Sequence, residues 1–329
     1  MPDVFLDPRL PDYFEDIDLS TPAGASAVLP AFLSSKIGVL RGVDLAALDF
    51  DLLRSISFPQ LWEMKKFQFS RFALDFKARG EAAQYYALVL EACGRDMSRF
   101  NALLKQFTRL TRILDDLHAR IFDGVVVERV DLLCRFSETR QENLHYDQDV
   151  GCDDHEGFRL YINIDSAPRI WGVSYQLNDL AERLAGRIKA EKLADLPSEQ
   201  LVKTITSRVF GGWHNRADER AAPRHMVYFD PGDIWVVDGR SVAHQVLYGQ
   251  RVITTYARIP LAANPTLSPS FHEKARAALT AASGPPNRAD ASITLRGPSI
   301  LPPTSKHHGE ASLAKPVRAG CAGSMNAAW

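Results

Sequence analysis

Three side chains of this sequence have the types and the spacing to bind one metal ion. His145 and Asp147 stand two positions apart, and residues i and i+2 of an extended strand point to the same face, so the imidazole and the carboxylate can reach one ion. His244, which begins another β-rich run, is available as a third ligand. Two histidines and one carboxylate on one side of an octahedral ion leave its other positions open, the ligand arrangement of non-haem iron(II) oxygenases. The sequence therefore predicts an iron(II) site with room for dioxygen and a bidentate co-substrate.

The elements that must position these ligands are short strands. After residue 124 the sequence changes to short β-rich runs with turn residues between them, a pattern that predicts a barrel or a sandwich. The runs cover residues 125–136, 158–165, 169–175, 226–229, 234–237 and 252–259. The turn at 230–233, Asp-Pro-Gly-Asp, predicts a hairpin between two of them, because proline presets φ and glycine accepts a positive φ.

Helical patterns flank these strands. Apolar residues at three- and four-residue steps predict a helix within residues 81–122 that packs against a sheet. A second helical pattern predicts an insert at 175–210. We expect residues 1–80 to form an N-terminal extension of mixed short elements, 81–280 to form the main domain, and the proline-rich tail at 281–329 to be disordered.

The composition excludes several classes of protein. The chain has 39 basic and 40 acidic residues, so it lacks the overall field that would hold nucleic acid or an anionic membrane. Its N-terminus lacks the pattern of a signal peptide, and no apolar stretch approaches the ~20 residues of a membrane-spanning helix. Four cysteines far apart in sequence fit a reducing compartment. We expect a cytoplasmic protein with a small-molecule substrate, no nucleic-acid partner and no integral membrane segment; the sequence does not predict its oligomeric state.

Residues 122–260 resemble the iron(II)/2-oxoglutarate dioxygenase superfamily, and within it they are most similar to hydroxylases of Kdo, 3-deoxy-D-manno-oct-2-ulosonic acid. The likeness is carried by the stretches LHYD (144–147), FRLYINI (158–164), PRIW (168–171), DPGDIW (230–235) and HQVLYGQ (244–250). The resemblance implies an α+β fold with a double-stranded β-helix (jelly-roll) core. It also implies Fe(II) as cofactor, 2-oxoglutarate and dioxygen as co-substrates, and His145, Asp147 and His244 as metal ligands. Because related halogenases lack the carboxylate, Asp147 favours hydroxylation.

Arginines are the candidates for binding the far carboxylate of 2-oxoglutarate, because the planar guanidinium makes two parallel hydrogen bonds to a carboxylate. The resemblance favours Arg258 or Arg251, with Thr254 as a hydroxyl partner. Arg159 and Arg169 are the other candidates, and they are equally suited to an acidic substrate; any of the four arginines can instead be a structural charge. Further predicted substrate contacts are Asn163, Trp171 and Tyr161.

The expected reaction is hydroxylation of an unactivated C–H bond in a small polar substrate, of which a Kdo-like sugar is the first candidate. Arg251, Arg258 and the long tail depart from the Kdo enzymes and leave a second reading open, a hydroxylase or desaturase of an amino acid or natural product. A third reading is a sugar-binding β-barrel that keeps the fold without catalysis.

Overall fold

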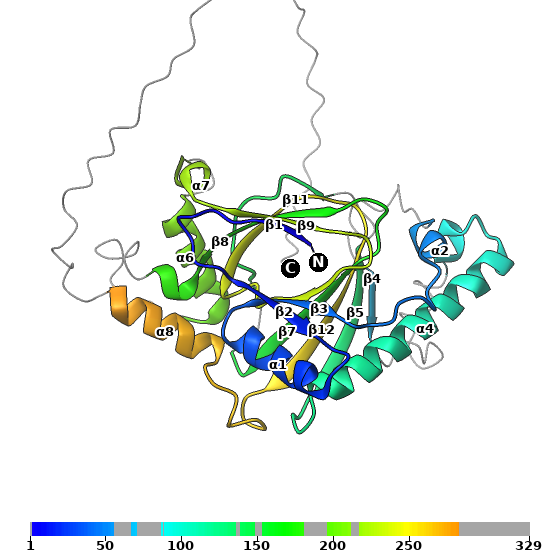
Figure 1. The fold of residues 1–329 in the computed structure, drawn as a ribbon, viewed down its shortest axis with the longest axis horizontal. Helices are drawn as coiled ribbons and strands as arrows, with labels where there is room; N and C mark the ends of the chain where they lie inside the picture. The colour runs from blue at the N-terminus through cyan, green and yellow to red at the C-terminus, as the bar shows by residue number, and fades with distance from the viewer. Residues whose placement is uncertain are drawn as a thin grey trace, which may run out of the picture. The chain divides into compact units, whose positions relative to one another are not determined.

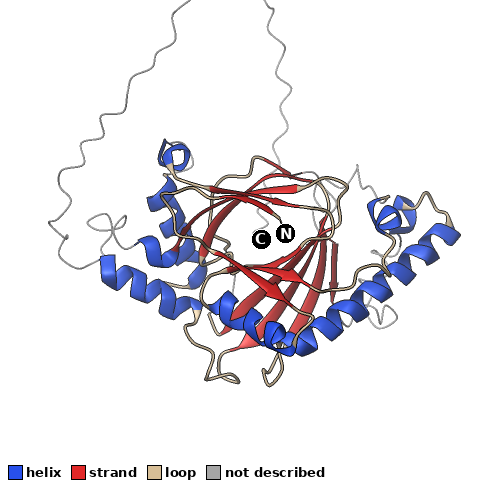
Figure 2. Ribbon diagram, viewed as in Figure 1, coloured by secondary structure: helices blue, strands red, loops and turns tan. Residues whose placement is uncertain are grey.

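The computed structural model describes residues 2–55, 67–70, 87, 89–135, 139–148, 153–180, 196–211 and 217–282, and all structural statements refer to these residues. They form two β-sheets with helices on the outer faces (Figures 1 and 2). The five-stranded sheet has the order β1 (Asp3–Phe5), β9 (His225–Phe229), β8 (Arg169–Gln176), β11 (Val242–Gly249) and β6 (Thr139–Arg140). The seven-stranded sheet has the order β2 (Phe14–Asp18), β3 (Ile37–Arg41), β10 (Ile234–Val236), β7 (His155–Asn163), β12 (Val252–Pro260), β5 (Arg129–Arg135) and β4 (Phe67–Ser70). The predicted α+β class is confirmed, because helices accompany both sheets.

The two sheets face one another across a shared apolar core. This core takes Trp171, Val173 and Val246 from the five-stranded sheet and Trp235 and Val252 from the seven-stranded sheet. Because side chains alternate along a strand, the neighbouring residues Ile234, Val236 and Ile253 of the seven-stranded sheet face outward and pack with the helices. The space between the sheets is therefore the interior that the predicted ligands must reach.

The outer face of the seven-stranded sheet is covered by α1 (Pro22–Leu33) and α4 (Met97–Ile121), as Figure 1 shows. The side chain of Asp96 caps α4 by accepting the backbone N–H groups of Ser98 and Arg99. Leu104 of the apolar stripe predicted from the sequence is partly buried, and its other members are buried: Phe100, Leu103, Phe107, Leu110, Leu114, Leu117 and Ile121. Each such side chain contributes about 1.5–3 kcal/mol of hydrophobic stabilisation. A short helix, α2 (Phe50–Arg54), contacts α4.

A second group of helices, away from α1 and α4, packs against the segment that carries His145 and Asp147. A second apolar cluster joins η1 (Leu177–Leu180), α6 (Ser198–Phe210) and α8 (Phe271–Ala282) to Leu144, Tyr146 and Ala243. The short helix α7 (Ala217–Ala221) lies beside α6. Burial of Leu144 and Tyr146 on either side of His145 fixes the direction in which that histidine points.

Several predicted elements differ from the observed ones. The helix predicted at 81–122 is interrupted: residues 87 and 89–92 are helical, the chain then turns at Gly94 and Arg95, where φ is positive, and α4 begins at Met97. Residues 81–86 and 88 lie outside the described part. The turn at 230–233 does not form a hairpin of paired strands: β9 belongs to one sheet and β10 to the other, so the turn carries the chain between sheets. Residues that favour a turn reverse the chain locally, but they do not determine which strands pair with each other.

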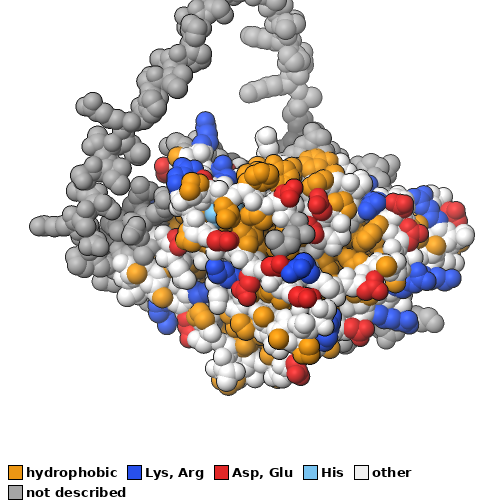
Figure 3. Space-filling model, in the orientation of Figure 1, with side chains coloured by type: hydrophobic (Ala, Val, Ile, Leu, Met, Phe, Trp, Pro, Cys, Tyr) orange, Lys and Arg blue, Asp and Glu red, His pale blue; other side chains and the backbone are white. Residues whose placement is uncertain are grey.

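Strands β1, β2 and β3 lie within the predicted N-terminal extension of mixed short elements, and they pair inside the two sheets. The predicted insert begins after Gln176, where β8 ends, and its residues 181–195 lie outside the described part. Helix α8 was not predicted, and the tail beyond residue 282 is not described. No helix among the described residues is long and apolar enough to cross a membrane. On the face drawn in Figure 3, acidic and basic side chains are interspersed.

Candidate metal centre

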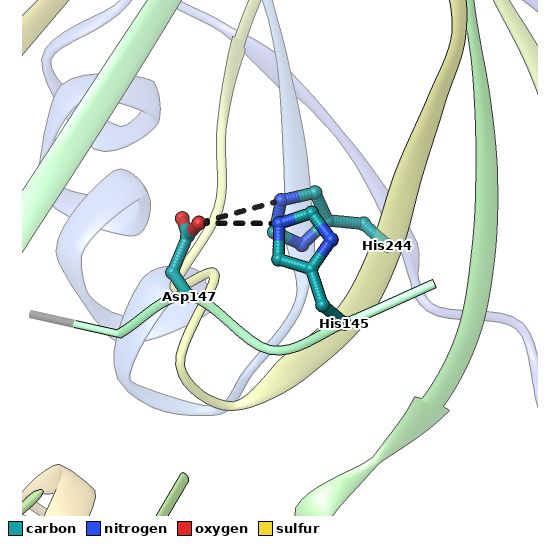
Figure 4. Close-up of side chains that lie close together, drawn as sticks. All are labelled: His145, Asp147 and His244. Atoms are coloured by element: carbon teal, nitrogen blue, oxygen red, sulfur yellow. Dashed lines mark ion pairs between the residues drawn. The ribbon is translucent and has the colours of Figure 1, made fainter. Parts of the chain in front are cut away.

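The structure brings His145, Asp147 and His244 together (Figure 4). The Asp147 Oδ1 atom lies 3.7 Å from His145 Nε2 and 3.8 Å from His244 Nε2, and the three ligand atoms all lie within 4.8 Å of one another. Octahedral neighbours around an ion with bonds of about 2.1 Å lie about 3 Å apart. The two Asp147–histidine distances exceed this spacing by about 0.7–0.8 Å, so a small contraction would make Oδ1 and each Nε2 octahedral neighbours.

Backbone hydrogen bonds fix the two ligand-bearing segments against each other. His145 and His244 form an isolated antiparallel bridge, with N–O distances of 3.0 and 2.9 Å. The chain then turns, and the Asp147 N–H donates to the Gly239 carbonyl at 2.8 Å. The ligands do not share one regular strand as the spacing predicted; the bridge and the Gly239 contact bring them together instead.

Side chains from the helical side hold the same segment. The Glu219 carboxylate on α7 accepts the backbone N–H of Leu144 at 3.0 Å, and the Tyr146 hydroxyl donates to the Tyr175 carbonyl on β8 at 3.0 Å. Leu144 and Tyr146 are both buried. The neighbours of His145 are thus anchored, so the imidazole is held in place without a bound ion.

Hydrogen bonds select the tautomer of both histidines. His145 Nδ1 lies 2.6 Å from the Asn143 carbonyl, and His244 Nδ1 lies 3.0 Å from the Val242 carbonyl. A carbonyl oxygen only accepts, so each Nδ1 carries the proton and donates it. Each Nε2 then presents a lone pair toward Asp147, which is the orientation a metal ligand needs.

Burial and charge act differently on the three groups. Burial lowers the pKa of His244 and outweighs the opposing effect of the Asp147 carboxylate, which favours the neutral ligand form. Burial also acts to lower the pKa of His145, but the hydrogen bond and charge of Asp147 raise it overall; His145 is 33% exposed and His244 is 6% exposed. Burial opposes ionisation of Asp147, yet the charges of Arg159 and His244 hold its pKa well below the ordinary value.

Arg159 lies on β7 against the metal-site carboxylate. Its guanidinium forms a hydrogen-bonded ion pair with Asp147 Oδ2 and lies 5.5 Å from the centre of the Tyr256 ring on β12. Since Oδ1 faces the two histidines, the two carboxylate oxygens have separate partners. The arrangement leaves Asp147 one oxygen for a metal ion.

Aromatic side chains line the interior beside His244. Trp171 stacks on the His244 ring with a centroid distance of 5.0 Å, and Tyr161 stacks on Trp235 at 5.2 Å. Thr254 is buried opposite Tyr161 in the register of β12 and β7. Among the described residues, neither Trp171 Nε1 nor Trp235 Nε1 has a hydrogen-bond acceptor, although both atoms are buried. Two buried donors in one interior favour an acceptor-rich ligand there.

The remaining predicted residues lie in different surroundings. Arg169 is 2% exposed on β8, and its guanidinium lies over Gly249, where a Cβ atom would come within 2.4 Å of Nη1. Arg251 lies 3.1 Å from Gln250 Oε1 and 3.9 Å from the Asp165 carboxylate.

Arg258 contacts three side chains at the end of β12: His155 Nδ1 at 3.1 Å, Glu128 at 3.6 Å and Asp154 at 3.8 Å. Asn163 donates to the carbonyls of Ala167 and Phe229 and accepts the N–H of Asp165. The amide of Asn163 is therefore engaged in holding the backbone.

No protein-family model matches this sequence, and no curated protein matches it either. Solved structures do match. A Kdo hydroxylase described as a non-haem Fe(II) alpha-ketoglutarate-dependent dioxygenase, in complex with succinate and Fe(III), aligns with a TM-score of 0.52 at 13% identity, covering 82% of this chain and 96% of that chain. The chain shares the fold of this Kdo hydroxylase. Structures of the hydroxylase with cobalt(II) and with alpha-ketoglutarate and Fe(III) align with TM-scores of 0.51 and 0.50, also at 13% identity. The likeness extends well beyond residues 122–260, the part from which it was expected.

Gly239, Trp235 and Tyr256 contact the site or line its interior, although none of them was among the predicted site residues. Gly239 is the most consequential of the three, because its carbonyl orients Asp147. The only signal for it was its place in the Asp-Gly-Arg turn before His244, and such turns are common.

Proposed function

We propose that this chain is an iron(II)- and 2-oxoglutarate-dependent oxygenase that hydroxylates an unactivated C–H bond of a small polar substrate on a double-stranded β-helix core. The observation that carries the proposal is the convergence of His145 Nε2, His244 Nε2 and Asp147 Oδ1 from segments far apart in the sequence. The fold shared with an Fe(II)- and alpha-ketoglutarate-dependent hydroxylase supports it.

The donor set fits ferrous iron. Two imidazoles with Nδ1 protonated and one carboxylate are ligands of intermediate and hard character, and they do not include the thiolates that mark structural zinc sites. When bound, the iron and the 2-oxo acid would supply the oxidising power, with dioxygen consumed and succinate and carbon dioxide released. The chain's own task is to hold the ligands, orient the co-substrate and exclude water.

The interior between the sheets also fits a dicarboxylate. Trp171 and Trp235 place buried N–H donors there, and the Thr254 hydroxyl lies on the same face of the seven-stranded sheet as Tyr161. Arg169 alternates with Trp171 along β8, and its register partner Phe229 belongs to the core between the sheets, so Arg169 also faces this interior.

We assign the far carboxylate of 2-oxoglutarate to Arg169. Of the four candidate arginines, Arg169 is the most buried, at 2% exposed, and it faces the interior between the sheets. Its planar guanidinium can bind a carboxylate there through two parallel hydrogen bonds.

Succinate formation tests the function. Anaerobically purified protein loaded with Fe(II) is given 2-oxoglutarate and dioxygen, with a Kdo-containing lipid in one series and a panel of amino acids in another. The expected result is succinate release that is stimulated by one substrate class and abolished in Asp147→Ala. The matched control is Asp51→Ala, which removes an exposed carboxylate distant in sequence from the three ligands and should leave succinate release unchanged. Failure to bind iron together with no consumption of 2-oxoglutarate would favour a non-catalytic sugar-binding barrel. Stimulation by an amino acid and not by the lipid would exclude the Kdo assignment.

A further inference from the structure

Four charged side chains are buried together behind the metal centre. Asp238, Arg240 and Glu156 are each 1% exposed, and Lys274 is 3% exposed. Lys274 Nζ lies 2.8 Å from Asp238 Oδ2, Arg240 Nε lies 3.3 Å from Asp238 Oδ1, and Arg240 Nη2 is hydrogen-bonded to Glu156. Two positive and two negative charges therefore neutralise one another within this group, which we name the buried charge cluster.

The buried charge cluster ties together three elements that are distant in sequence. Glu156 lies on β7, Asp238 and Arg240 lie in the loop between β10 and β11, and Lys274 lies in the first turns of α8. The start of α8 contributes twice more: the Phe271 N–H donates to Glu156 Oε1 at 2.8 Å, and the Phe271 ring lies 4.8 Å from the Arg240 guanidinium. Helix α8 is thus fastened to the loop rather than merely packed on it.

The same loop forms one wall of the metal centre. The Gly239 carbonyl accepts the N–H of Asp147. A Cβ atom at Gly239 would lie 2.2 Å from Asp147 Oδ2 and 3.0 Å from His244 Cε1, so the backbone at Gly239 is in direct contact with both ligands. Any displacement of this loop would be transmitted to the carboxylate.

A second connection runs from Asp238 to His244. The Asp238 carbonyl accepts the N–H of Val242 at 3.0 Å, and the Val242 carbonyl in turn binds His244 Nδ1 at 3.0 Å. The hydroxyl of Ser241 also donates to the Asp238 carboxylate. Asp238 therefore stands between Lys274 on one side and two metal ligands on the other, one reached through Gly239 and one through Val242.

Buried ion pairs add little net stability, because the cost of removing charges from water offsets their attraction. Their directional contacts instead select one arrangement of the groups that carry them, and removing one partner leaves its counter-charge buried without compensation. In this chain the arrangement selected is the position of the loop at 238–241. The cluster is better suited to fixing that loop than to stabilising the fold.

We propose that Lys274, acting through Asp238, is a positioning residue of the metal centre: α8 holds the loop at 238–241 where Gly239 orients Asp147 and Val242 orients His244. The inference rests on the proposed function, since it assumes that these ligands bind a divalent metal ion. The proposal gives α8 a role at the metal centre, although no described residue of α8 has a hydrogen bond or ion pair with any of the three ligands.

Cobalt(II) affinity tests the proposal. Lys274→Met removes one charge and keeps most of the side-chain volume, and we expect it to weaken Co(II) binding about 10- to 100-fold, the range found when partners of metal ligands are removed. The matched control is Leu110→Ala in α4, which lowers Tm by opening a cavity between α4 and the outer face of the seven-stranded sheet and should change the dissociation constant less than about twofold. Lys274→Arg should restore affinity. Equal affinities in Lys274→Met, Leu110→Ala and the wild type would overturn the proposal.

Hydrogen exchange of the metal-free protein provides a second readout. The peptide covering residues 143–148 includes the Asp147 amide, which is protected by the Gly239 carbonyl. We expect this peptide to exchange faster in Lys274→Met, and to a smaller degree in Ser241→Ala, a mild variant that keeps all four charges and will fold if Lys274→Met does not. Unchanged exchange in the variants that fold would refute the positioning role. A wild type that binds no divalent metal would instead refute the proposed function, while exchange still decides whether α8 controls the loop.

Discussion

Gly239→Ala is the substitution whose effect on the metal centre the structure defines most sharply. The backbone at Gly239 is not in the left-handed region, so alanine can adopt its conformation without strain. The added methyl group would, however, lie 2.2 Å from Asp147 Oδ2 and 2.8 Å from Asp147 Cγ. Ordinary van der Waals contact begins at about 3.4 Å, so the carboxylate or the loop must move by about 1.2 Å.

A movement of this size exceeds what a metal ligand tolerates. Metal–ligand distances are held to within about 0.2 Å, so a carboxylate displaced by about 1.2 Å ceases to be a full ligand. Disturbing a partner of a ligand costs about 10- to 100-fold in metal affinity, and losing the ligand itself should cost at least the upper value. We therefore expect Gly239→Ala to weaken Co(II) binding about 100-fold or more, equivalent to about 2.8 kcal/mol.

The assay is a Co(II) titration of the metal-free variant, with the circular dichroism spectrum and Tm confirming that it is folded. Gly172→Ala is the matched control, because it adds the same methyl group to β8 where the nearest atoms belong to the side chains of Gln245 and Arg224. The control should bind Co(II) as the wild type does. Wild-type affinity in a folded Gly239→Ala protein would refute the argument that this backbone fixes the carboxylate.

Three further outcomes follow from the site. Arg159→Met should destabilise the metal-free protein by about 1–3 kcal/mol in urea unfolding. It should also enlarge the rise in Tm on adding Co(II), because the ion replaces the lost cation beside Asp147. A rise in Tm equal to that of the wild type would contradict this. Trp171→Phe keeps the ring on His244 but removes Nε1–H, so the KM for 2-oxoglutarate should rise about fivefold to tenfold at constant Co(II) affinity. Burial opposes ionisation of Asp238, but Lys274 and Arg240 lower its pKa. Its contribution to stability is therefore present above about pH 4 and is lost as the pH falls through the folded pKa. In urea unfolding, the free energy of unfolding should fall less between pH 6 and pH 3 in Asp238→Asn than in the wild type.

Much of the β core could be predicted from the sequence because its strands carry a strong local signal. Residues 252–259 alternate sides so that Ile253, Ala257 and Ile259 meet the helices, and the observed strand β12 extends this run by one residue. The convergence of the two histidines and Asp147 could be predicted because few residue types are suited to binding iron and their spacing is restrictive. The structure brings these three together as predicted.

What could not be predicted depends on pairing across long sequence separations. The turn at 230–233 has hairpin chemistry, but β9 pairs with β1 and β8 while β10 pairs with β3 and β7, and no local pattern specifies that choice. Gly239 has no side chain whose chemistry could identify it, and its importance arises only from contact with Asp147. Lys274 likewise carries no local signal of burial in the sequence, and only the fold places it against Asp238.

The most direct test of the central claim is a crystal structure of the protein prepared anaerobically with Fe(II) and 2-oxoglutarate. We expect a single ferrous ion bound by His145 Nε2, Asp147 Oδ1 and His244 Nε2, with 2-oxoglutarate on the opposite side of the ion and its far carboxylate at Arg169. An ion bound elsewhere, or one that leaves any of the three side chains out of its coordination sphere, would contradict the claim.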